Sequence, residues 1–177
     1  ITEGIKLYDV MSNATVLADT GVNLNSLYTK DSIELEDGSK VPILEATQYY
    51  NPGKIYLMMG VNSLLSDEET FRADYGRVVD TLMTQHPDAI LYIQSILPVS
   101  KAYAQKDPRM ANDTIDWYNQ QLLKLAEEKN LYYLDTAQAL KGADNNLDPR
   151  FDKGDGLHFN AAAGEAILTY IRTHALP

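Results

Sequence analysis

The stretch Asp155-Gly156-Leu157-His158 combines residue types that general-base chemistry needs. The chain has three histidines, and only His158 has a carboxylate at fixed short range with a glycine on the same turn. Such a carboxylate fixes the tautomer of an imidazole and stabilises the imidazolium that forms when the ring takes a proton. The alternative is an exposed loop His that happens to follow an Asp, since short motifs match by accident.

Length and composition narrow the possible classes of protein. The 177 residues, 45% of them hydrophobic, predict one domain over residues 1–177 with a sizeable core. The net charge of −10 argues against nucleic acid and anionic membrane surfaces as partners. No apolar run approaches the roughly 20 residues of a membrane span. The absence of Cys excludes disulfides, thiolate catalysis and Cys-ligated metals.

Apolar runs alternate with helical patterns along the chain. Short continuous apolar runs, as in buried parallel strands, occur at residues 54–59, 89–97 and 131–135, with a shorter candidate at 15–19. Helical periodicity occupies 66–85, 112–129 and the segment capped by Asn160, and a further helix is expected near Ile5, Tyr8 and Met11. Ser66 and Glu69 have capping-box spacing, and residues 33–44 resemble either a small hairpin around Asp37-Gly38 or an irregular insertion. This alternation predicts an α/β fold with a parallel sheet.

In such a sheet, ligands bind at the carboxyl ends of the strands. Gly21 and Asn62 follow two of the predicted strands, and His158 closes the long connection after a third. The three residues are therefore expected to converge on one edge. A backbone N–H at Gly21 and the side-chain amide of Asn62 would form an oxyanion hole, in which each donor is typically worth roughly 3 kcal/mol of barrier.

These residues carry a resemblance to a known superfamily. Gly21, Gly60-Val61-Asn62 and Asp155-Gly156-Leu157-His158 resemble, in order and spacing, the blocks of the SGNH-hydrolase (GDSL-type esterase/lipase) superfamily. The resemblance implies a three-layer α/β/α sandwich with a flavodoxin-like five-stranded parallel sheet, and no metal or organic cofactor. It implies that His158 is the general base, Asp155 its orienting acid, and Gly21 and Asn62 the oxyanion donors. One departure is Ser63, where the family often has an acidic residue.

A larger departure concerns the nucleophile, because no serine in the chain has the context of a nucleophile elbow. Ile1-Thr2-Glu3-Gly4 is similar to the stretch that follows the family's Gly-Asp-Ser, so the nucleophilic Ser and the first strand are expected directly upstream of Ile1. That strand would be central in the order 2-1-3-4-5, and its loss would leave buried backbone groups unpaired at about 1–3 kcal/mol each. The alternative is an inactive protein that begins at Ile1.

The substrate is less sharply defined by the sequence. Tyr103 and Arg150 follow strand ends and are candidates to line the site. We expect a small-molecule or glycan ester, with a small-acyl (acetyl) esterase as the favoured function. The alternatives are a lysophospholipase or thioesterase, a sugar O-acyltransferase, and a non-catalytic carbohydrate-binding module on a degenerate fold. The stretches IYLMMGVN (residues 55–62) and YIQSILPV (residues 92–99) resemble those of family members from Gram-positive gut-type bacteria. Many of these proteins are exported, which favours the cell exterior over the cytoplasm.

Overall fold

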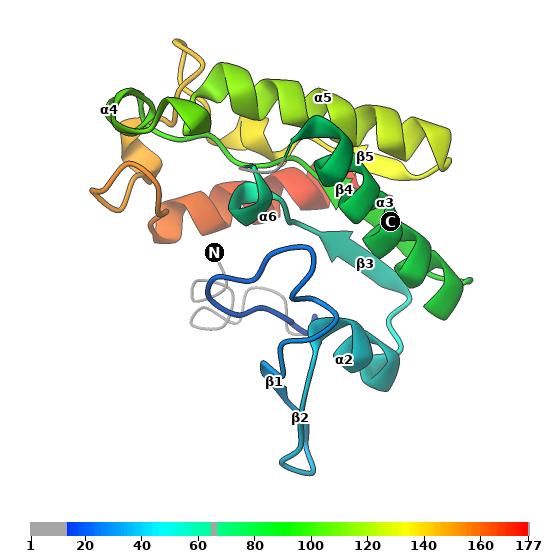
Figure 1. Cartoon of the computed structure of the whole chain (residues 1–177). Coiled ribbons are helices and arrows are strands. Elements are labelled where there is room, and N and C mark those ends of the chain that lie inside the picture. Colours follow the sequence, from blue (N-terminus) through cyan, green and yellow to red (C-terminus); the bar gives the residue numbers. More distant parts are fainter. Residues whose placement is uncertain (1–13, 65–66, 177) are drawn as a thin grey trace.

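A three-stranded parallel sheet lies at the centre of the computed structural model, which describes residues 14–64 and 67–176 (Figure 1). Its strands are β3 (Lys54–Leu57), β4 (Ile90–Gln94) and β5 (Tyr132–Leu134), in the order β3-β4-β5. All three were predicted from the sequence, over longer ranges. The difference lies mainly at the carboxyl ends, where the chain leaves the ladder to build the loops of one sheet edge.

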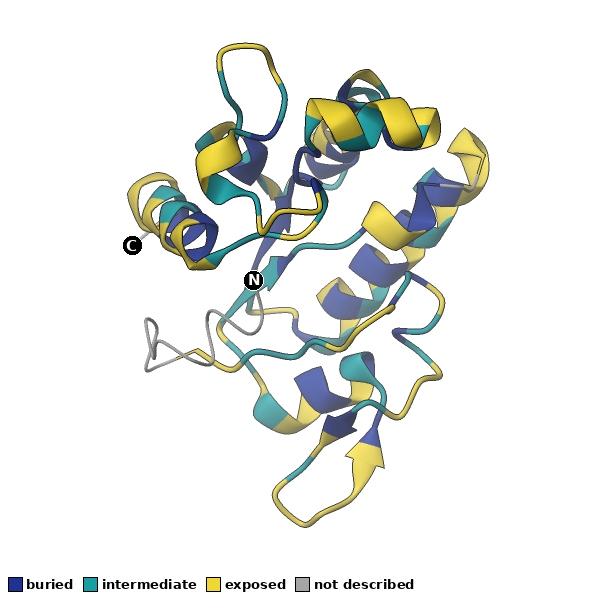
Figure 2. Ribbon diagram, turned by 90° about the vertical axis from the view of Figure 1, so that its left-hand side faces the viewer, coloured by how far each residue is buried: buried dark blue, intermediate teal, exposed yellow. Residues whose placement is uncertain are grey.

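Helices cover both faces of this sheet. The first face carries α3 (Glu68–Gln85) and α5 (Asn112–Glu128), and the second carries α6 (Ala161–His174). Side chains alternate along β4, so that Ile93 belongs to the core under α3 and α5, whereas Tyr92 belongs to the core under α6. Figure 2 shows the buried faces of the helices turned toward the sheet. The described residues therefore form an α/β fold in which helices pack on both faces of a parallel sheet.

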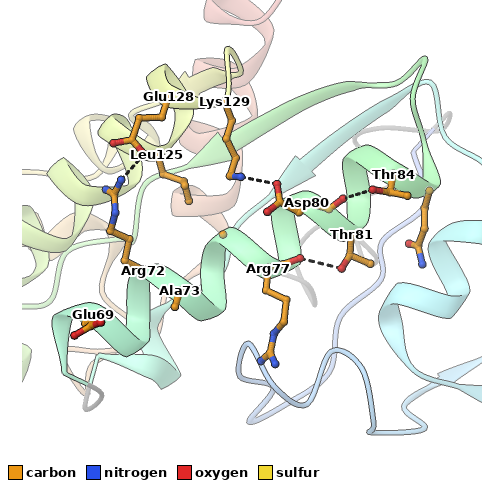
Figure 3. Close-up of a pocket in the computed structure, with 12 residues that line it drawn as sticks. Glu69, Arg72, Ala73, Arg77, Asp80, Thr81, Thr84, Leu125, Glu128 and Lys129 are labelled. Carbon is orange, nitrogen blue, oxygen red and sulfur yellow. Dashed lines mark hydrogen bonds and ion pairs between the residues drawn. The ribbon is translucent and has the colours of Figure 1, made fainter.

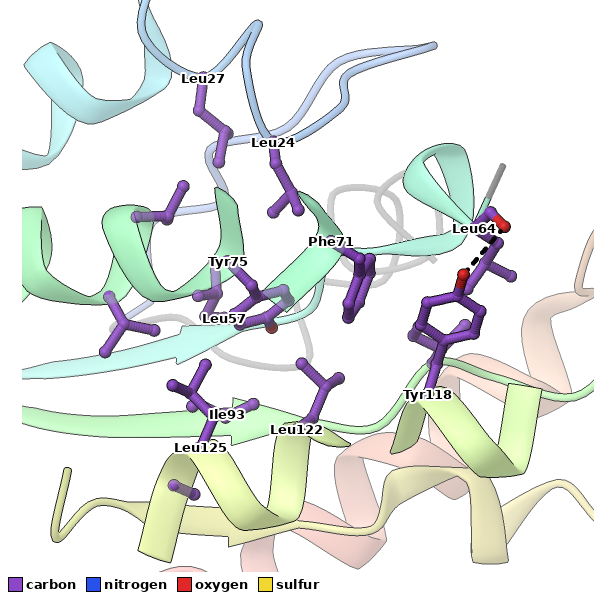
Figure 4. Packing of buried hydrophobic residues seen from close by; sticks show 14 of the residues in the cluster. Leu24, Leu27, Leu57, Leu64, Phe71, Tyr75, Ile93, Tyr118, Leu122 and Leu125 are labelled. Carbon is purple, nitrogen blue, oxygen red and sulfur yellow. Dashed lines mark hydrogen bonds between the residues drawn. The ribbon is translucent and has the colours of Figure 1, made fainter. Parts of the chain in front are cut away.

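The core under α3 and α5, called the first core below, contains a group of aromatic side chains. The ring of Phe71 lies 4.6 Å from that of Tyr118 and 5.8 Å from that of Tyr75, measured between centroids (Figure 4). Phe71 and Tyr75 are almost completely buried between the sheet and α5. Truncating such an aromatic residue to Ala typically costs about 3–5 kcal/mol. The burial of Phe71 and Tyr75 therefore helps to hold α3 on the sheet.

The second core explains part of the tyrosine content of the chain. Tyr56, Tyr92 and Tyr132 stand opposite one another on neighbouring strands. The Tyr56 and Tyr92 rings are stacked at 4.8 Å, and the Tyr92 and Tyr132 rings lie 5.2 Å apart. The Tyr92 hydroxyl also accepts a hydrogen bond from the Leu176 amide at 3.0 Å. Tyr56 and Tyr92 thus pack in the core under α6, Tyr132 is exposed on the neighbouring strand, and Tyr92 holds the end of the chain on the sheet.

The helix starts agree with the sequence in one case and differ in another. Asn160 caps α6, its side chain accepting from the Ala163 amide at 3.2 Å, as predicted. At α3 the cap is Asp67, which accepts from the Thr70 amide at 2.9 Å, so the predicted Ser66–Glu69 capping box is replaced. Ser66 itself lies outside the described residues.

A small antiparallel hairpin precedes the sheet, as predicted. It joins β1 (Ile33–Glu34) to β2 (Lys40–Val41) and turns at Gly38, whose φ of +82° suits glycine. The short helix α2 (Ile43–Tyr50) follows and leads into β3.

Two parts of the expected sheet differ. Residues 15–19 form no strand, so that prediction was wrong, and the described residues contain three parallel strands rather than five. In the expected order, residues 15–19 would pair with the central first strand, and none of the described residues supplies it. A strand without a hydrogen-bonded neighbour is not stable. The helix expected near Ile5, Tyr8 and Met11 lies outside the described residues.

Shorter elements complete the edge where the strands end. They are the helix α4 (Lys101–Lys106) and four 3₁₀ turns, η1 (Val61–Ser63), η2 (Pro108–Met110), η3 (Thr136–Ala139) and η4 (Pro149–Phe151). Within the described stretches, no helix has both the length and the apolar character needed to cross a membrane.

Candidate active site

Asp155 and His158 form a close polar pair in the long connection that follows β5. Asp155 Oδ2 lies 2.6 Å from His158 Nδ1, and Asp155 Oδ1 accepts from the backbone amides of Leu157 at 2.9 Å and His158 at 2.8 Å. One carboxylate oxygen thus binds the turn and the other binds the imidazole. Nδ1 is directed at the carboxylate, while Nε2 has no hydrogen-bond partner among the described residues. This is the geometry of an oriented base.

The electrostatics of the pair favour an ionised Asp155. The two backbone N–H groups, that of His158 first, and then the imidazole hold the pKa of the Asp155 carboxyl well below its usual range. The carboxylate therefore remains negative at any pH near neutrality. A fixed negative charge beside Nδ1 stabilises the protonated ring during proton transfer.

The loop that carries the pair is closed by backbone bonds. Lys153 N–H donates to the His158 carbonyl at 2.9 Å, and Asn160 N–H donates to the Phe151 carbonyl at 3.0 Å. Asp152 and Phe159 form an isolated antiparallel bridge. Residues 151–160 are thus a short two-sided turn whose tip carries the two catalytic candidates.

Asparagine side chains on α5 guide the segment after β4 toward this loop. Asn119 binds both the N–H and the carbonyl of Ile96, at 2.7 and 2.9 Å, and Asn112 does the same for Val99, at 3.0 and 2.8 Å. The amides take the place of a neighbouring strand and keep the chain extended. The segment ends at Ser100, whose N–H donates to the Gly156 carbonyl at 2.8 Å.

Asn62 is placed by a turn that glycine permits. Gly60 has a φ of +126°, and a Cβ there would lie 2.7 Å from Cδ1 of Ile96. A side chain at this position would therefore meet both a strained conformation and the core. The chain turns sharply after β3 into η1, which presents Asn62 at the sheet edge.

Gly21 lies in the turn directly before Val22, and Val22 contacts Asn62. The Asn62 side-chain amide donates to the carbonyl of Val22 at 2.8 Å, and the Ser63 hydroxyl accepts from the Leu24 amide at 3.5 Å. Gly21 has a φ of +71° in the turn leading to Val22. The structure therefore brings the two oxyanion candidates together in one pair and the two base candidates together in another.

The turn after β3 and the orange segment that includes residues 151–160 lie on the side of the molecule to which the strands point (Figure 1). This follows from the parallel sheet, because β3 ends before Asn62 and the connection after β5 ends at His158. No contact between described residues joins one pair directly to the other.

The two substrate-lining candidates have different surroundings. Tyr103, on α4, is half-buried against the first core and lies beside Gly156. The side chain of Arg150 is 77% exposed and is held by Asp148, with Nε and Nη2 at 3.0 and 2.7 Å from Oδ2. Its guanidinium lies 5.3 Å from the centroid of the Phe151 ring. Tyr103 thus borders the loop of residues 151–160, called the base loop below. Arg150 precedes this loop, and its side chain is directed to solvent.

A separate groove lies between α3 and α5, away from these residues (Figure 3). Its charges are paired across the two helices, Arg72 with Glu128 and Lys129 with Asp80. It contains none of the candidate catalytic residues. In the described part of the chain, no three His, Asp or Glu side chains are grouped as metal ligands would be.

Three contributors to the site were not given individual roles from the sequence. They are Asp152, Ser100 and the carbonyl of Val22, which hold the candidates through loop and backbone contacts. The sequence did contain a signal for Asp152, since an Asp followed by two nearby glycines is typical of a side chain that binds turn amides.

Comparison with known proteins gives a family match over most of the chain. Residues 14–166 match the model of the GDSL-like lipase/acylhydrolase family. No protein with a curated description matches the sequence significantly.

Solved structures with the same fold include proteins of three bacteria. A protein from Streptococcus pneumonia described as a platelet activating factor is 19% identical, with a TM-score of 0.74. The match covers 98% of this chain and 79% of the Streptococcus chain. A catalytic mutant of an acetylxylan esterase from Geobacillus stearothermophilus is 16% identical, with a TM-score of 0.64, over 89% and 69%. A GDSL-like lipase from Bacteroides thetaiotaomicron is 15% identical, with a TM-score of 0.57, over 69% and 61%.

Proposed function

Because the chain belongs to the GDSL-like lipase/acylhydrolase family, and is thus a serine ester hydrolase, we propose that it removes small acyl groups, acetyl above all, from carbohydrate or similar esters. The observation that carries this proposal is the Asp155–His158 pair, with Oδ2 and Nδ1 2.6 Å apart, at the carboxyl edge of a parallel sheet. This edge is where open α/β sheets bind their ligands.

In the proposed first step, a serine hydroxyl attacks the ester carbonyl while its proton passes to Nε2 of His158. The nucleophile is the Ser expected directly upstream of Ile1. The oxygen of the tetrahedral intermediate accepts hydrogen bonds from Gly21 N–H, the Asn62 side chain and the N–H of the nucleophile itself. The C–O bond to the alcohol then breaks, and His158 returns the proton to the departing oxygen.

In the second step, water attacks the acyl-enzyme. His158 again takes the proton, now from water, and the serine oxygen leaves with a proton from the imidazolium, which releases the acid. Asp155 remains ionised throughout, which agrees with the lowered pKa of its carboxyl. Its part is to hold the ring and to stabilise its positive charge.

The preference for small acyl groups on carbohydrate is supported first by a structural neighbour with the same fold, an acetylxylan esterase at 16% identity. The site also has an aromatic residue, Tyr103, next to the base loop. A sugar ring can stack on an exposed aromatic face, so we propose Tyr103 as a substrate-lining residue, with Arg150 at the outer rim.

The test is a substrate panel. Hydrolysis of p-nitrophenyl acetate, butyrate and octanoate would be compared with deacetylation of acetylated xylo-oligosaccharides by the same preparation. We expect kcat/KM to be highest for acetyl esters. A preference for the long chain would contradict the proposal and favour a lysophospholipase or thioesterase. Acyl transfer to an added sugar, with little free acid, would indicate an acyltransferase, and glycan binding without turnover a carbohydrate-binding module.

A further inference from the structure

We propose that Asp152 is the positioning residue of the Asp155–His158 pair and that Asn160 completes its action from the opposite side of the loop. The inference rests on the proposed function, since it concerns the same catalytic pair. Asp152 touches neither residue's side chain in the contacts of the loop. It binds the backbone amides of Gly154 and Gly156, the residues on either side of Asp155.

The pair needs such a residue because it is open to solvent. The side chain of His158 is 68% exposed and that of Asp155 is 54% exposed. Packing against a core therefore does little to fix either rotamer. Exposed ion pairs are individually weak, because ordering two side chains costs conformational entropy. The separation of 2.6 Å between Nδ1 and Oδ2 must consequently depend on a loop backbone that is already in place.

Asp152 supplies that order on the inner side of the turn. Its Oδ1 accepts from the amide of Gly154 at 2.7 Å and from the amide of Gly156 at 2.9 Å. Both glycines have positive φ angles, +112° and +81°, so the chain curls around this one oxygen. Asp155 lies in the chain between Gly154 and Gly156, whose amides bind Asp152. These two bonds therefore fix the backbone from which the Asp155 side chain projects.

Asn160 ties the same turn to a helix. Its Nδ2 donates to the carbonyl of Arg150 at 2.8 Å and to the carbonyl of Asp152 at 3.3 Å, while its Oδ1 caps α6 at Ala163. The Nδ2 group of Asn160 therefore holds the start of the loop, while its Oδ1 fixes the end of the loop to α6. Asp152 is held through its carbonyl and in turn holds Gly154 and Gly156 through its carboxylate.

On the other side, the loop is docked on Ser100. The Gly156 carbonyl accepts from the Ser100 amide at 2.8 Å, and a Cβ on Gly156 would lie 2.2 Å from Ser100 Oγ. Gly156 is buried, although its neighbours Asp155 and His158 are exposed. The turn is thus fixed at Asp152, Asn160 and Ser100, and Asp155 and His158 project from it.

The experiment compares Asp152→Ala and Asp152→Asn with Asp37→Ala. Asn keeps an acceptor oxygen for the two glycine amides, whereas Ala removes it. Asp37 is a matched control, since its Oδ1 also accepts two bonds, from Ser39 N and Oγ at 2.9 and 2.6 Å, in the hairpin far from the base loop (Figure 1). The measurements are kcat and KM on p-nitrophenyl acetate and the low-field proton resonance of His158 Nδ1, assigned with His158→Ala.

We expect Asp152→Ala to lower kcat about 10–100-fold, by loss of orientation, with KM within about twofold, and to weaken or abolish the Nδ1 proton resonance. Asp152→Asn should retain most of the wild-type kcat and of the Nδ1 proton resonance. Asp37→Ala should change neither kcat nor the resonance. An Asp152→Ala protein with normal kcat and an unchanged resonance would overturn the inference. Equal losses in Asn and Ala would also overturn it, because the negative charge rather than the acceptor would then matter.

If Asp152→Ala does not fold, Asn160→Asp provides a second test. The new carboxylate keeps the cap of α6 but removes the donor to the Arg150 and Asp152 carbonyls, so helicity should remain while kcat and the resonance fall. Unchanged kcat and resonance would contradict the inference. Failure of the proposed function is distinguishable, since a wild-type protein without esterase activity would still show whether the Nδ1 resonance depends on Asp152.

Discussion

The side-chain amide of Asn62 donates to the backbone carbonyl of Val22 at 2.8 Å. This one bond fixes Asn62 against the residue that follows Gly21, so the two proposed oxyanion donors are positioned by a shared contact. It uses one of the two hydrogens on Nδ2. The second hydrogen is left for the substrate oxygen, which is what an oxyanion hole needs.

Replacing Asn62 by Ala should lower kcat for p-nitrophenyl acetate by about 10²–10³-fold, the usual loss for one oxyanion donor. KM should change little, because the contact forms fully only in the transition state. Asn25→Ala is the control, since that amide binds Asp74 on the surface of α3 at 3.1 Å. Steady-state kinetics would contradict the assignment if KM rose while kcat stayed the same.

Replacing His158 by Ala should remove nearly all hydrolysis, because no base would take the proton of the nucleophile. The melting temperature should hardly change, since the side chain is 68% exposed. His174→Ala is a matched control at the end of α6, where that ring stacks on Tyr170. Initial rates and thermal melts measure both effects, and full activity in a folded His158→Ala protein would exclude His158 as the base.

Replacing Gly156 by Ala should destabilise the protein for two reasons. The φ of +81° is strained for Ala, at about 1–3 kcal/mol, and the new Cβ would meet Ser100 Oγ, which is bound to the Tyr103 amide. Gly154→Ala, with φ of +112° and open space, isolates the backbone strain, and Gly53→Ala carries neither penalty. Urea denaturation should rank stability as Gly53→Ala above Gly154→Ala above Gly156→Ala. Equal stability of the last two would show that the contact with Ser100 is unimportant.

The pH dependence of stability should reveal the ionised Asp155. Its folded-state pKa lies below the unfolded value, so its ionisation contributes stability that is fully present above about pH 4 to 5 and is lost as the pH falls below the unfolded pKa. The difference in melting temperature between wild type and Asp155→Asn should be largest near pH 6 and should shrink in acid. A difference that grows on acidification would reverse the sign and contradict the assignment.

Local features of the site were predictable from the sequence, whereas features that depend on distant partners were not. Asp155 and His158 are three residues apart, so one turn suffices to join them. The strand expected at residues 15–19 failed because strand formation depends on a neighbour. Asp152 was given no role of its own because its partners are the Gly154 and Gly156 amides, and the Asp-Gly spacing that indicates such a turn does not by itself indicate a catalytic site. Asp67 capped α3 in place of Ser66, a difference of one residue that local propensity does not resolve.

The central claim is a serine nucleophile activated by His158, and labelling with a fluorophosphonate tests it most directly. The natural polypeptide that contains residues 1–177 would be treated with the reagent, digested and mapped by mass spectrometry, beside its His158→Ala variant. The account predicts one adduct, on a Ser immediately before Ile1, that is absent in the variant. Absence of any adduct, or an adduct on a serine within residues 1–177, would contradict it.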